Sequence, residues 1–145
     1  MYIGKVSELT EEVYETVKLL VPQLGAHKAN PTWDELHALI RSEASTLIVA
    51  RYPNETGQIA GVLTLTIYRV PTGLRSIVED VIVDEKMRRR GIAEALMRYA
   101  IELAREAGAN GVALTSNPQR EAANKLYQAL GFQKRETNAY FYKLG

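Results

Sequence analysis

The length, composition and charge of this chain restrict what it can be. Its 145 residues are 46% apolar and 24% charged, which is typical of one folded domain with its own core and argues against a disordered chain. Lys and Arg number 18 and Asp and Glu number 17, so the net charge is +1. This balance disfavours a protein dedicated to nucleic acids or membrane surfaces, which carries a large positive excess.

Cysteine is absent from the sequence, which excludes disulfides, zinc–thiolate sites and a cysteine nucleophile on this chain. With only His27 and His37 as imidazoles, we expect no metal site. No apolar run approaches the ~20 residues of a membrane helix, and the first residues lack the pattern of a signal peptide. We therefore expect a cytoplasmic protein with no membrane partner.

The first half of the chain predicts a strand, two helices and then three strands. Alternating apolar residues predict a strand over 2–6, and helical spacing predicts a helix from Ser7 that ends at Pro22 and Gly25. After a loop, Thr32 with Glu35 three residues later forms a capping box for a second helix. The three strands are predicted over residues 46–52, 58–70 and 76–83, and the short turns between them favour an antiparallel meander.

The second half of the chain alternates helix and strand. A helix is predicted over 91–107 with Gly108 after it, a short strand over 111–116, and a second helix over 118–130 with Ser116 or Asn117 as its N-cap. Candidate closing strands follow at 132–134 and 140–144. A strand–helix–strand unit from 77 to 115 implies a right-handed crossover between parallel strands, so the predicted class is α/β with a mixed sheet, all within one domain over residues 1–145.

The most informative segment joins the third strand of the meander to the next helix, with the sequence V-I-V-D-E-K-M-R-R-R-G-I-A over residues 81–93. The start of a helix offers unpaired N–H groups to an anion, Gly91 allows close backbone approach, and Ala93 adds little bulk. A solvated basic turn is the alternative. Three arginines in succession, Arg88, Arg89 and Arg90, oppose the helix dipole unless an anion binds there, so we favour a pyrophosphate site.

Two motifs in the second half resemble those of the GNAT superfamily of N-acetyltransferases. R-R-R-G-I-A over 88–93 is similar to the family's R/Q-x-x-G-x-G/A loop for the pyrophosphate of acyl-CoA, and the strand over 77–83 is similar to its central strand. N-K-L-Y-Q-A-L-G-F over 124–132 looks like its later L-Y-x-x-x-G-F motif. The resemblance is strong from 77 to 132 and rests on element order in the first half. It implies a GNAT-like, mostly antiparallel sheet with flanking helices and a central parallel strand pair.

The resemblance also assigns roles to individual residues. It implies that a bulged central strand holds the pantetheine arm of acetyl-CoA through backbone groups of Val81, Ile82 and Val83, and that Arg88, Arg89, Arg90, Gly91, Ile92 and Ala93 hold the pyrophosphate. Tyr127 is the candidate acid for the leaving thiolate, with core packing as the alternative. Glu79 is the candidate base, acting through water. In an alternating strand it shares a face with Ile77 and Val81, in apolar surroundings that suit a base.

Several further residues are candidates for contact with substrates. Many family members have a cofactor-contacting Asn where this chain has Arg120, so either Asn124 or Arg120 itself replaces that contact. Asn117 is either a cofactor contact or only a helix cap. The resemblance places the second helix on the acceptor side. Candidate residues for the acceptor are Trp33, His37, Tyr68, Tyr140 and Tyr142, although each is also explained by ordinary packing.

Together these features predict an N-acetyltransferase that moves an acetyl group from acetyl-CoA directly to a primary amine of a small molecule or peptide. The lack of Cys removes an acyl-cysteine intermediate. A non-catalytic acyl-CoA sensor on the same fold is the main alternative. A nucleic-acid module that uses residues 88–90 is disfavoured by the net charge. The fold also suggests a homodimer.

Overall fold

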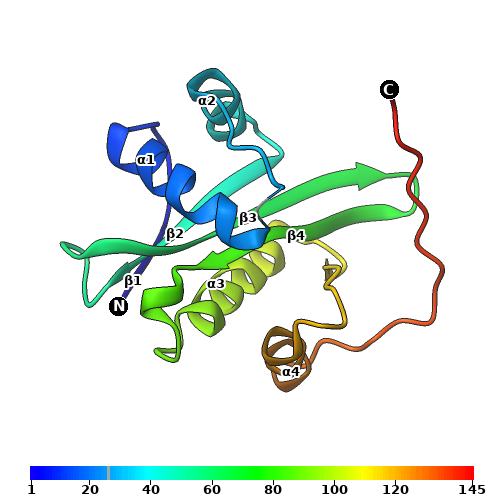
Figure 1. Ribbon diagram of the computed structural model, residues 1–145. Coiled ribbons are helices and arrows are strands. Elements are labelled where there is room, and N and C mark those ends of the chain that lie inside the picture. Colours follow the sequence, from blue (N-terminus) through cyan, green and yellow to red (C-terminus); the bar gives the residue numbers. More distant parts are fainter. Residues whose placement is uncertain (26) are drawn as a thin grey trace. The chain divides into compact units, whose positions relative to one another are not determined.

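The strands form one sheet of five in the order β1-β2-β3-β4-β5 (Figure 1). This computed structural model describes residues 1–25 and 27–145. Each of the first four strands pairs antiparallel with the next, and β5 pairs parallel with β4. Their bounds are β1 Tyr2–Lys5, β2 Ser45–Tyr52, β3 Gln58–Val70, β4 Gly73–Val83 and β5 Val112–Ala113. The sheet is therefore mostly antiparallel with one parallel pair, which confirms the predicted fold class.

The described chain divides into two compact units, Met1–Thr115 and Ser116–Gly145. The sheet belongs to the first unit, together with the helices α1 (Glu11–Leu20), α2 (Trp33–Arg41) and α3 (Ile92–Ala107). The second unit contains α4 (Glu121–Ala129). A single domain over residues 1–145 stays a prediction.

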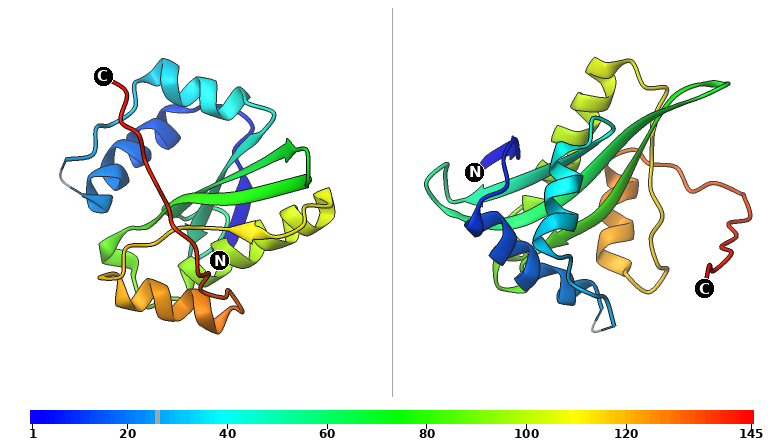
Figure 2. Two further views of the ribbon diagram at one scale, coloured as in Figure 1. Left: turned by 90° about the vertical axis from the view of Figure 1, so that its right-hand side faces the viewer. Right: turned by 90° about the horizontal axis from the view of Figure 1, so that it is seen from above.

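Helices cover both faces of the sheet in the first unit, as Figure 2 shows. One face packs on α1 and α2 in a core cluster made of Val13, Val17, Leu20, Leu36, Leu47, Val49, Ile59, Val62 and Ile82. The long helix α3 lies on the opposite face and buries Ile92, Leu96, Met97, Ala100 and Ala104. Gly61 of β3 permits this packing, because a Cβ there would lie 3.2 Å from side-chain atoms of both Ile92 and Leu96. The start of α3 is thus held closely against β3.

The predicted start of the second helix is confirmed, whereas the first helix begins at Glu11 and not at Ser7. Thr10 caps α1, since its hydroxyl accepts a hydrogen bond from Val13 N–H at 3.2 Å. Thr32 and Glu35 form the expected capping box, with reciprocal bonds of 3.1 and 2.9 Å. A short 3₁₀ helix, η1 (Val21–Leu24), follows α1 directly and contains Pro22. The capping box joins near neighbours in the sequence, which is why the pattern identifies it, whereas the Thr10 cap was not predicted.

Three predictions for the second half are wrong. The strand over 111–116 shortens to β5, Val112–Ala113. Neither Ser116 nor Asn117 is the N-cap of α4, because that position falls at Arg120, with no side-chain cap. Among the described residues after α4, neither 132–134 nor 140–144 forms a strand. Alternating apolar side chains express a preference for extended backbone, whereas a strand exists only where a partner completes its hydrogen bonds.

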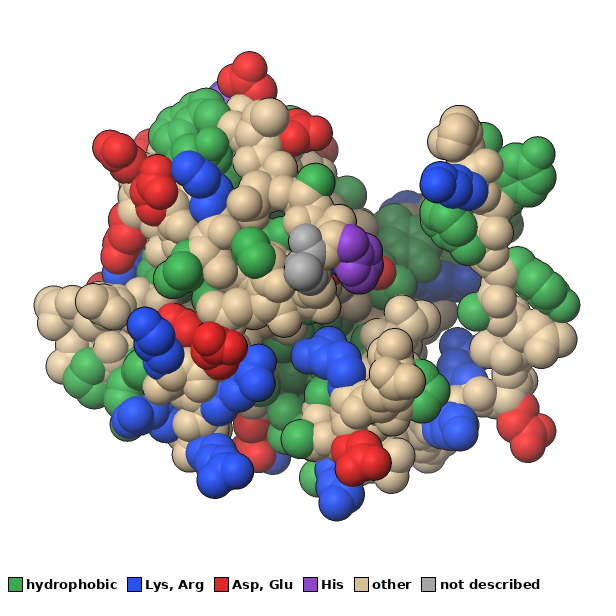
Figure 3. Space-filling model, viewed as in Figure 1, with side chains coloured by type: hydrophobic (Ala, Val, Ile, Leu, Met, Phe, Trp, Pro, Cys, Tyr) green, Lys and Arg blue, Asp and Glu red, His purple; other side chains and the backbone are tan. Residues whose placement is uncertain are grey.

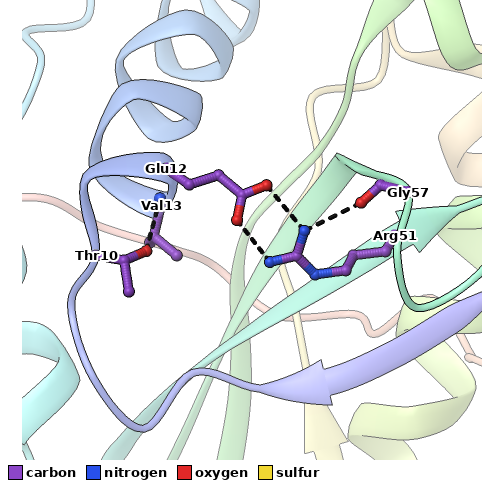
Figure 4. Close-up of polar contacts among 5 residues, drawn as sticks. All are labelled: Thr10, Glu12, Val13, Arg51 and Gly57. Carbon is purple, nitrogen blue, oxygen red and sulfur yellow. Dashed lines mark hydrogen bonds and ion pairs between the residues drawn. The ribbon is translucent and has the colours of Figure 1, made fainter.

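An ion pair joins the start of α1 to the β2–β3 hairpin (Figure 4). The Arg51 guanidinium donates to both carboxylate oxygens of Glu12, at 2.7 and 2.8 Å, and to the carbonyl oxygen of Gly57 at 3.0 Å. The hydrogen bonds and the charge of Arg51 lower the pKa of Glu12, against a smaller opposing effect of burial. Among the described ion pairs, this one has bidentate geometry, in which one guanidinium binds both carboxylate oxygens, and we expect it to stabilise the fold most.

Substitution of Arg51 by Met is expected to lower the free energy of unfolding by about 0.5–1 kcal/mol at pH 7, because Glu12 is half exposed and water screens the pair. Since folding lowers the pKa of Glu12, its stabilisation is present above about pH 4.5 and is lost as the pH falls below that value. The difference in the free energy of unfolding between variant and parent, measured by urea denaturation, should therefore be smaller at pH 3.5 than at pH 7. Arg98→Met, which removes an exposed pair with Glu94, is the control and should change stability less.

Candidate functional site

The segment between β4 and α3 carries the first part of the site. The Asp84 carboxylate accepts a hydrogen bond from Lys86 N–H at 3.2 Å and so caps a 3₁₀ turn, η2 (Glu85–Met87). The first helical hydrogen bond of α3 runs from Ala95 N–H to Gly91 O at 3.1 Å, and α3 has no side-chain cap. The amides of residues 92–94 therefore lack a helical acceptor and are available to an anion.

Gly91 has the left-handed conformation that the turn into α3 requires, with φ +75°. A Cβ at this position would meet no atom within 4 Å, so the space beside the glycine is open. Ala93 is half-buried, whereas the Ile92 side chain is 2% exposed and belongs to the core. Only the backbone of Ile92 is thus available to a ligand. An open cradle beside free amides fits a phosphate group.

The basic side chains of this segment, Lys86, Arg88, Arg89 and Arg90, are all exposed. In the space-filling view, Lys and Arg gather below the sheet, around the place where Figure 1 shows the segment before α3 (Figure 3). Arg89 adopts φ +65°. The Arg90 guanidinium lies 5.2 Å from the centre of the Tyr52 ring in a cation–π contact, which ties this end of the segment to β2. The exposed basic side chains therefore concentrate positive charge at the start of α3, although the chain as a whole is nearly neutral.

The central strand β4 contains the bulge that the resemblance implies. Thr64 of β3 lies opposite Glu79 and Val62 opposite Ile82, so Asp80 and Val81 together face one residue of β3. Asp80 takes φ +50°, which marks the bulge. On its other side β4 pairs with β5 only at Ser76 and Ile77, so no described strand pairs there with residues 79–83. The backbone of Val81, Ile82 and Val83 is thereby open to a ligand along this edge.

Glu79 has surroundings that differ from the prediction. It is exposed, so the expected apolar burial is wrong. Because it lies directly opposite Thr64, it shares the sheet face of Val62, the face on which α1 and α2 pack. The bulge also puts Ile82, and not Val81, on that face. Strict alternation fails at the extra residue, which a one-strand pattern does not reveal.

Polar side chains beside Glu79 form a row, of which only Tyr68 was predicted, as a candidate residue for the acceptor. Thr64, Thr66 and Tyr68 alternate along β3 and therefore lie on the same face as Glu79. The hydroxyls of Thr66 and Ser45 are 2.8 Å apart in a hydrogen bond. The signal was the alternating polar set in V-L-T-L-T-I-Y over 62–68, which indicates a face that is not fully covered by core.

In the second unit, Tyr127 is the buried residue of α4, at 6% exposure. Its ring packs edge-to-face on Phe132, with centroids 6.1 Å apart. Burial raises the pKa of Tyr127, and the positive charge of Arg120 opposes this more weakly. The phenol therefore keeps its proton at neutral pH, as a proton donor must. Its role as the acid stays a prediction.

Asn117 and Asn124 of the second unit build the turn before α4. The Asn124 side-chain amide donates to the carbonyl oxygens of Asn117 at 3.0 Å and Arg120 at 2.9 Å. Asn117 in turn accepts from Gln119 N–H at 2.9 Å through its side chain. Both N–H bonds of the Asn124 amide are thus used locally, and its side-chain oxygen is the group left for another partner. Cofactor contacts by Asn117 and Asn124 stay predictions.

A model of the acetyltransferase (GNAT) family matches residues 11–132, which include the whole β4–α3 segment and α4. The chain belongs to the GNAT family. Its segment with Gly91, its bulged β4 and the motif around Tyr127 all lie within the matched range. The earlier resemblance is therefore confirmed at the level of the family.

Individual relatives match over parts of their length. N-acetyltransferase family 8 member 2 of Rattus norvegicus is 34% identical over 87 residues, which cover 59% of this chain and 38% of that protein. N-acetyltransferase 8 of Homo sapiens is 42% identical over 52 residues, which cover 36% of this chain and 23% of the relative. The chain thus matches well under half the length of these curated relatives.

Solved structures share the fold over nearly the whole chain. An aminoglycoside acetyltransferase from an uncultured soil metagenomic sample, in complex with trehalose, aligns with a TM-score of 0.85 at 17% identity, covering 99% of this chain and 96% of the other. A probable acetyltransferase aligns at a TM-score of 0.82 and 21% identity, covering 100% and 99% of the two chains. At these identities the likeness supports the GNAT fold alone.

The candidate acceptor residues of this GNAT protein are mostly exposed. Trp33 is 42% exposed and packs edge-to-face on Tyr14, with centroids 5.3 Å apart, and His37 is exposed one turn further along α2. Tyr140 and Tyr142 are 89% and 87% exposed. Their part in acceptor binding stays a prediction. Trp33 is not a core residue, since Leu36 is the fully buried residue of α2.

Residues 1–25 and 27–145 contain no group of three or more His, Asp or Glu side chains arranged to hold a metal ion. No helix in this described part has both the length and the apolar character needed to span a bilayer.

Proposed function

We propose that this GNAT protein is an N-acetyltransferase that moves an acetyl group from acetyl-CoA directly to a primary amine of a small molecule or peptide. The observation that carries the proposal is the β4–α3 segment, where Gly91 leaves open space beside the uncapped start of α3 and exposed arginines precede it. Together with membership of the family, this arrangement supports a ligand that carries a pyrophosphate.

The fit to acetyl-CoA rests on two features of the first unit. Amides of residues 92–94 and the side chains of Arg88 and Arg89 would hold the pyrophosphate. The open edge of β4 at Val81, Ile82 and Val83 would hold the pantetheine arm by backbone hydrogen bonds, as an added strand is held. When bound, acetyl-CoA supplies an acetyl thioester that an amine can attack.

The residues of the chain would supply proton transfers and charge stabilisation. Glu79 lies exposed beside a polar row on one sheet face, so its carboxylate is accessible to take a proton from an ammonium group through water. Free N–H groups at the bulge would stabilise a developing oxyanion. The protonated Tyr127 phenol would give its proton to the departing thiolate. No Cys is present to form an acyl-enzyme.

Acetyl-CoA binding and turnover test this proposal. Thermal unfolding should shift upward with acetyl-CoA, because a ligand that binds only the folded state stabilises it. Release of CoA should then be followed over a panel of primary amines, namely amino acids, polyamines, aminoglycosides and peptides. Aminoglycosides belong in the panel because a solved structure with this fold is named for them. No thermal shift with acetyl-CoA would contradict the proposal.

A non-catalytic acyl-CoA sensor is the second candidate, since it would need the same binding segment. Glu79→Gln separates the two. If the protein is an enzyme, this variant should lower kcat by about 10²-fold while leaving acetyl-CoA binding unchanged, because it removes the base and keeps the shape. Asp80→Asn is the neighbouring control and should keep kcat near that of the parent. Equal binding with no turnover in the parent over the whole panel would favour the sensor.

The proposal also includes the location, the partners and the oligomeric state of the protein. The protein is expected to act in the cytoplasm on acetyl-CoA and an amine acceptor, as one domain, and without nucleic acid, membrane or metal. A homodimer is also proposed, and sedimentation equilibrium would measure it. An affinity for DNA that falls steeply with salt would contradict the expected lack of nucleic-acid binding.

A further inference from the structure

Gln23 forms hydrogen bonds with the β4–α3 segment across a gap of some sixty residues in sequence. Its side-chain oxygen accepts from Glu85 N–H at 3.0 Å. Its side-chain nitrogen lies 3.5 Å from a carboxylate oxygen of Asp84, the residue that caps η2. A neutral amide side chain thus meets both an N–H group and a carboxylate at the start of the segment. Glutamine suits this place because it donates and accepts at once.

The element that carries Gln23 is fixed to the core. Gln23 belongs to η1, which follows α1 without a break, and Val21 and Leu24 on either side pack against the core cluster under α1 and α2. Gln23 itself is half-buried. Because η1 is packed against the core, the position of the Gln23 amide is fixed. Its two hydrogen bonds therefore restrain the β4–α3 segment from an element that does not belong to that segment.

Gln23 contacts the β4–α3 segment at the residues where the chain leaves the sheet. Asp84 N–H donates to Ala60 O at 2.8 Å, which is a bond from the end of β4 to β3. From Asp84 onward the chain leaves the sheet, and the exposed arginines and Gly91 follow within seven residues. Inside η2, Met87 N–H donates to Asp84 O at 2.8 Å and Lys86 N–H to its carboxylate. Gln23 holds η2 through its first amide, before the residues assigned to the pyrophosphate.

We propose that Gln23 is a positioning residue that fixes the β4–α3 segment for the pyrophosphate of the acyl donor. The proposal rests on the proposed function and adds a residue outside the motifs assigned to acetyl-CoA. Gln23 itself touches no reacting atom. Without its hydrogen bonds, η2 and the arginines after it sample more conformations, and part of the binding energy of the donor goes into ordering them.

Gln23→Met tests the proposal, because methionine keeps the length and packing of the side chain and removes both polar atoms. KM for acetyl-CoA is expected to rise about five-fold, the equivalent of one neutral hydrogen bond, with kcat within two-fold of the parent. S-acetylpantetheine, which has the same thioester and no pyrophosphate, should be used with unchanged kcat/KM. A general loss of structure would affect both donors alike. Gln58→Met, at the exposed start of β3, is the matched control.

Amide hydrogen exchange gives a readout that does not depend on turnover. Exchange at Glu85 N–H should be about five-fold faster in Gln23→Met than in the parent and unchanged in Gln58→Met. An unchanged KM for acetyl-CoA, or an equal change for both donors, would overturn the proposal while leaving the proposed function intact. Failure of the parent protein to bind acetyl-CoA would overturn both, even with the exchange difference present.

Discussion

Tyr127→Phe is expected to lower kcat by about 10²–10³-fold, because the variant keeps the ring and loses the proton that the leaving thiolate needs. Burial holds the pKa of the Tyr127 phenol above its ordinary value, so the parent carries this proton throughout the neutral range. Phenylalanine also keeps the edge-to-face contact with Phe132, so stability should change little. Steady-state kinetics with saturating acetyl-CoA and an accepted amine measures the loss.

Two further measurements make this prediction decisive. Acetyl-CoA binding, followed by calorimetry, should be the same in Tyr127→Phe and in the parent. Tyr99→Phe on α3 is the matched control and should keep the kcat of the parent, since Tyr99 is half-buried, follows the amides assigned to the pyrophosphate and has no assigned role itself. A Tyr127→Phe variant with the full kcat would remove Tyr127 from the mechanism and return it to a packing role.

Gly91→Ala is expected to raise KM for acetyl-CoA by about ten-fold or more, because the added methyl group fills the open space beside the uncapped start of α3. The same helix supplies the control, since Gly108 at its other end is also left-handed, with φ +84° against +75°, and also meets nothing within 4 Å. Gly108→Ala imposes the same backbone strain away from the proposed site.

Both alanine variants should lower the free energy of unfolding by about 1 kcal/mol, since each forces a Cβ into the left-handed region. Only Gly91→Ala should lose affinity for acetyl-CoA. Urea denaturation measures the backbone strain in both variants, and kinetics with acetyl-CoA measures the loss of binding space at Gly91. The two measurements together therefore separate these effects. Equal losses of affinity in the two variants would mean that the stability of α3, and not the space at Gly91, governs binding.

Much of the candidate site is local in sequence and was predictable for that reason. The R-R-R-G-I-A segment joins a strand to a helix start, and these features lie within a few residues of one another. The left-handed Gly91 agrees with the close backbone approach expected of it. The capping box at Thr32 and the helix stop at Gly108 were predictable on the same ground, because a cap is a contact between near neighbours.

Features that depend on pairing between distant segments were missed or wrong. The bulge at Asp80 arises where β4 meets β3, and it puts Ile82, and not Val81, on the sheet face of Glu79. Glu79 lies opposite Thr64 and is exposed, which the pattern of its own strand does not predict. The closing strands predicted over 132–134 and 140–144 are absent among the described residues, although their composition favours extended chain. A strand pattern states a preference, and the partner decides whether it pairs.

The sequence by itself determined the family, the element order and a basic, glycine-containing helix start, because these follow from motifs and short-range hydrogen bonds. Only the tertiary structure decided that Gln23 meets Glu85, that Arg90 stacks on Tyr52 and that Arg51 ties α1 to the β2–β3 hairpin. Each of these contacts joins residues whose separation along the chain carries no periodic signal. Their geometry depends on how the packed core brings the elements together.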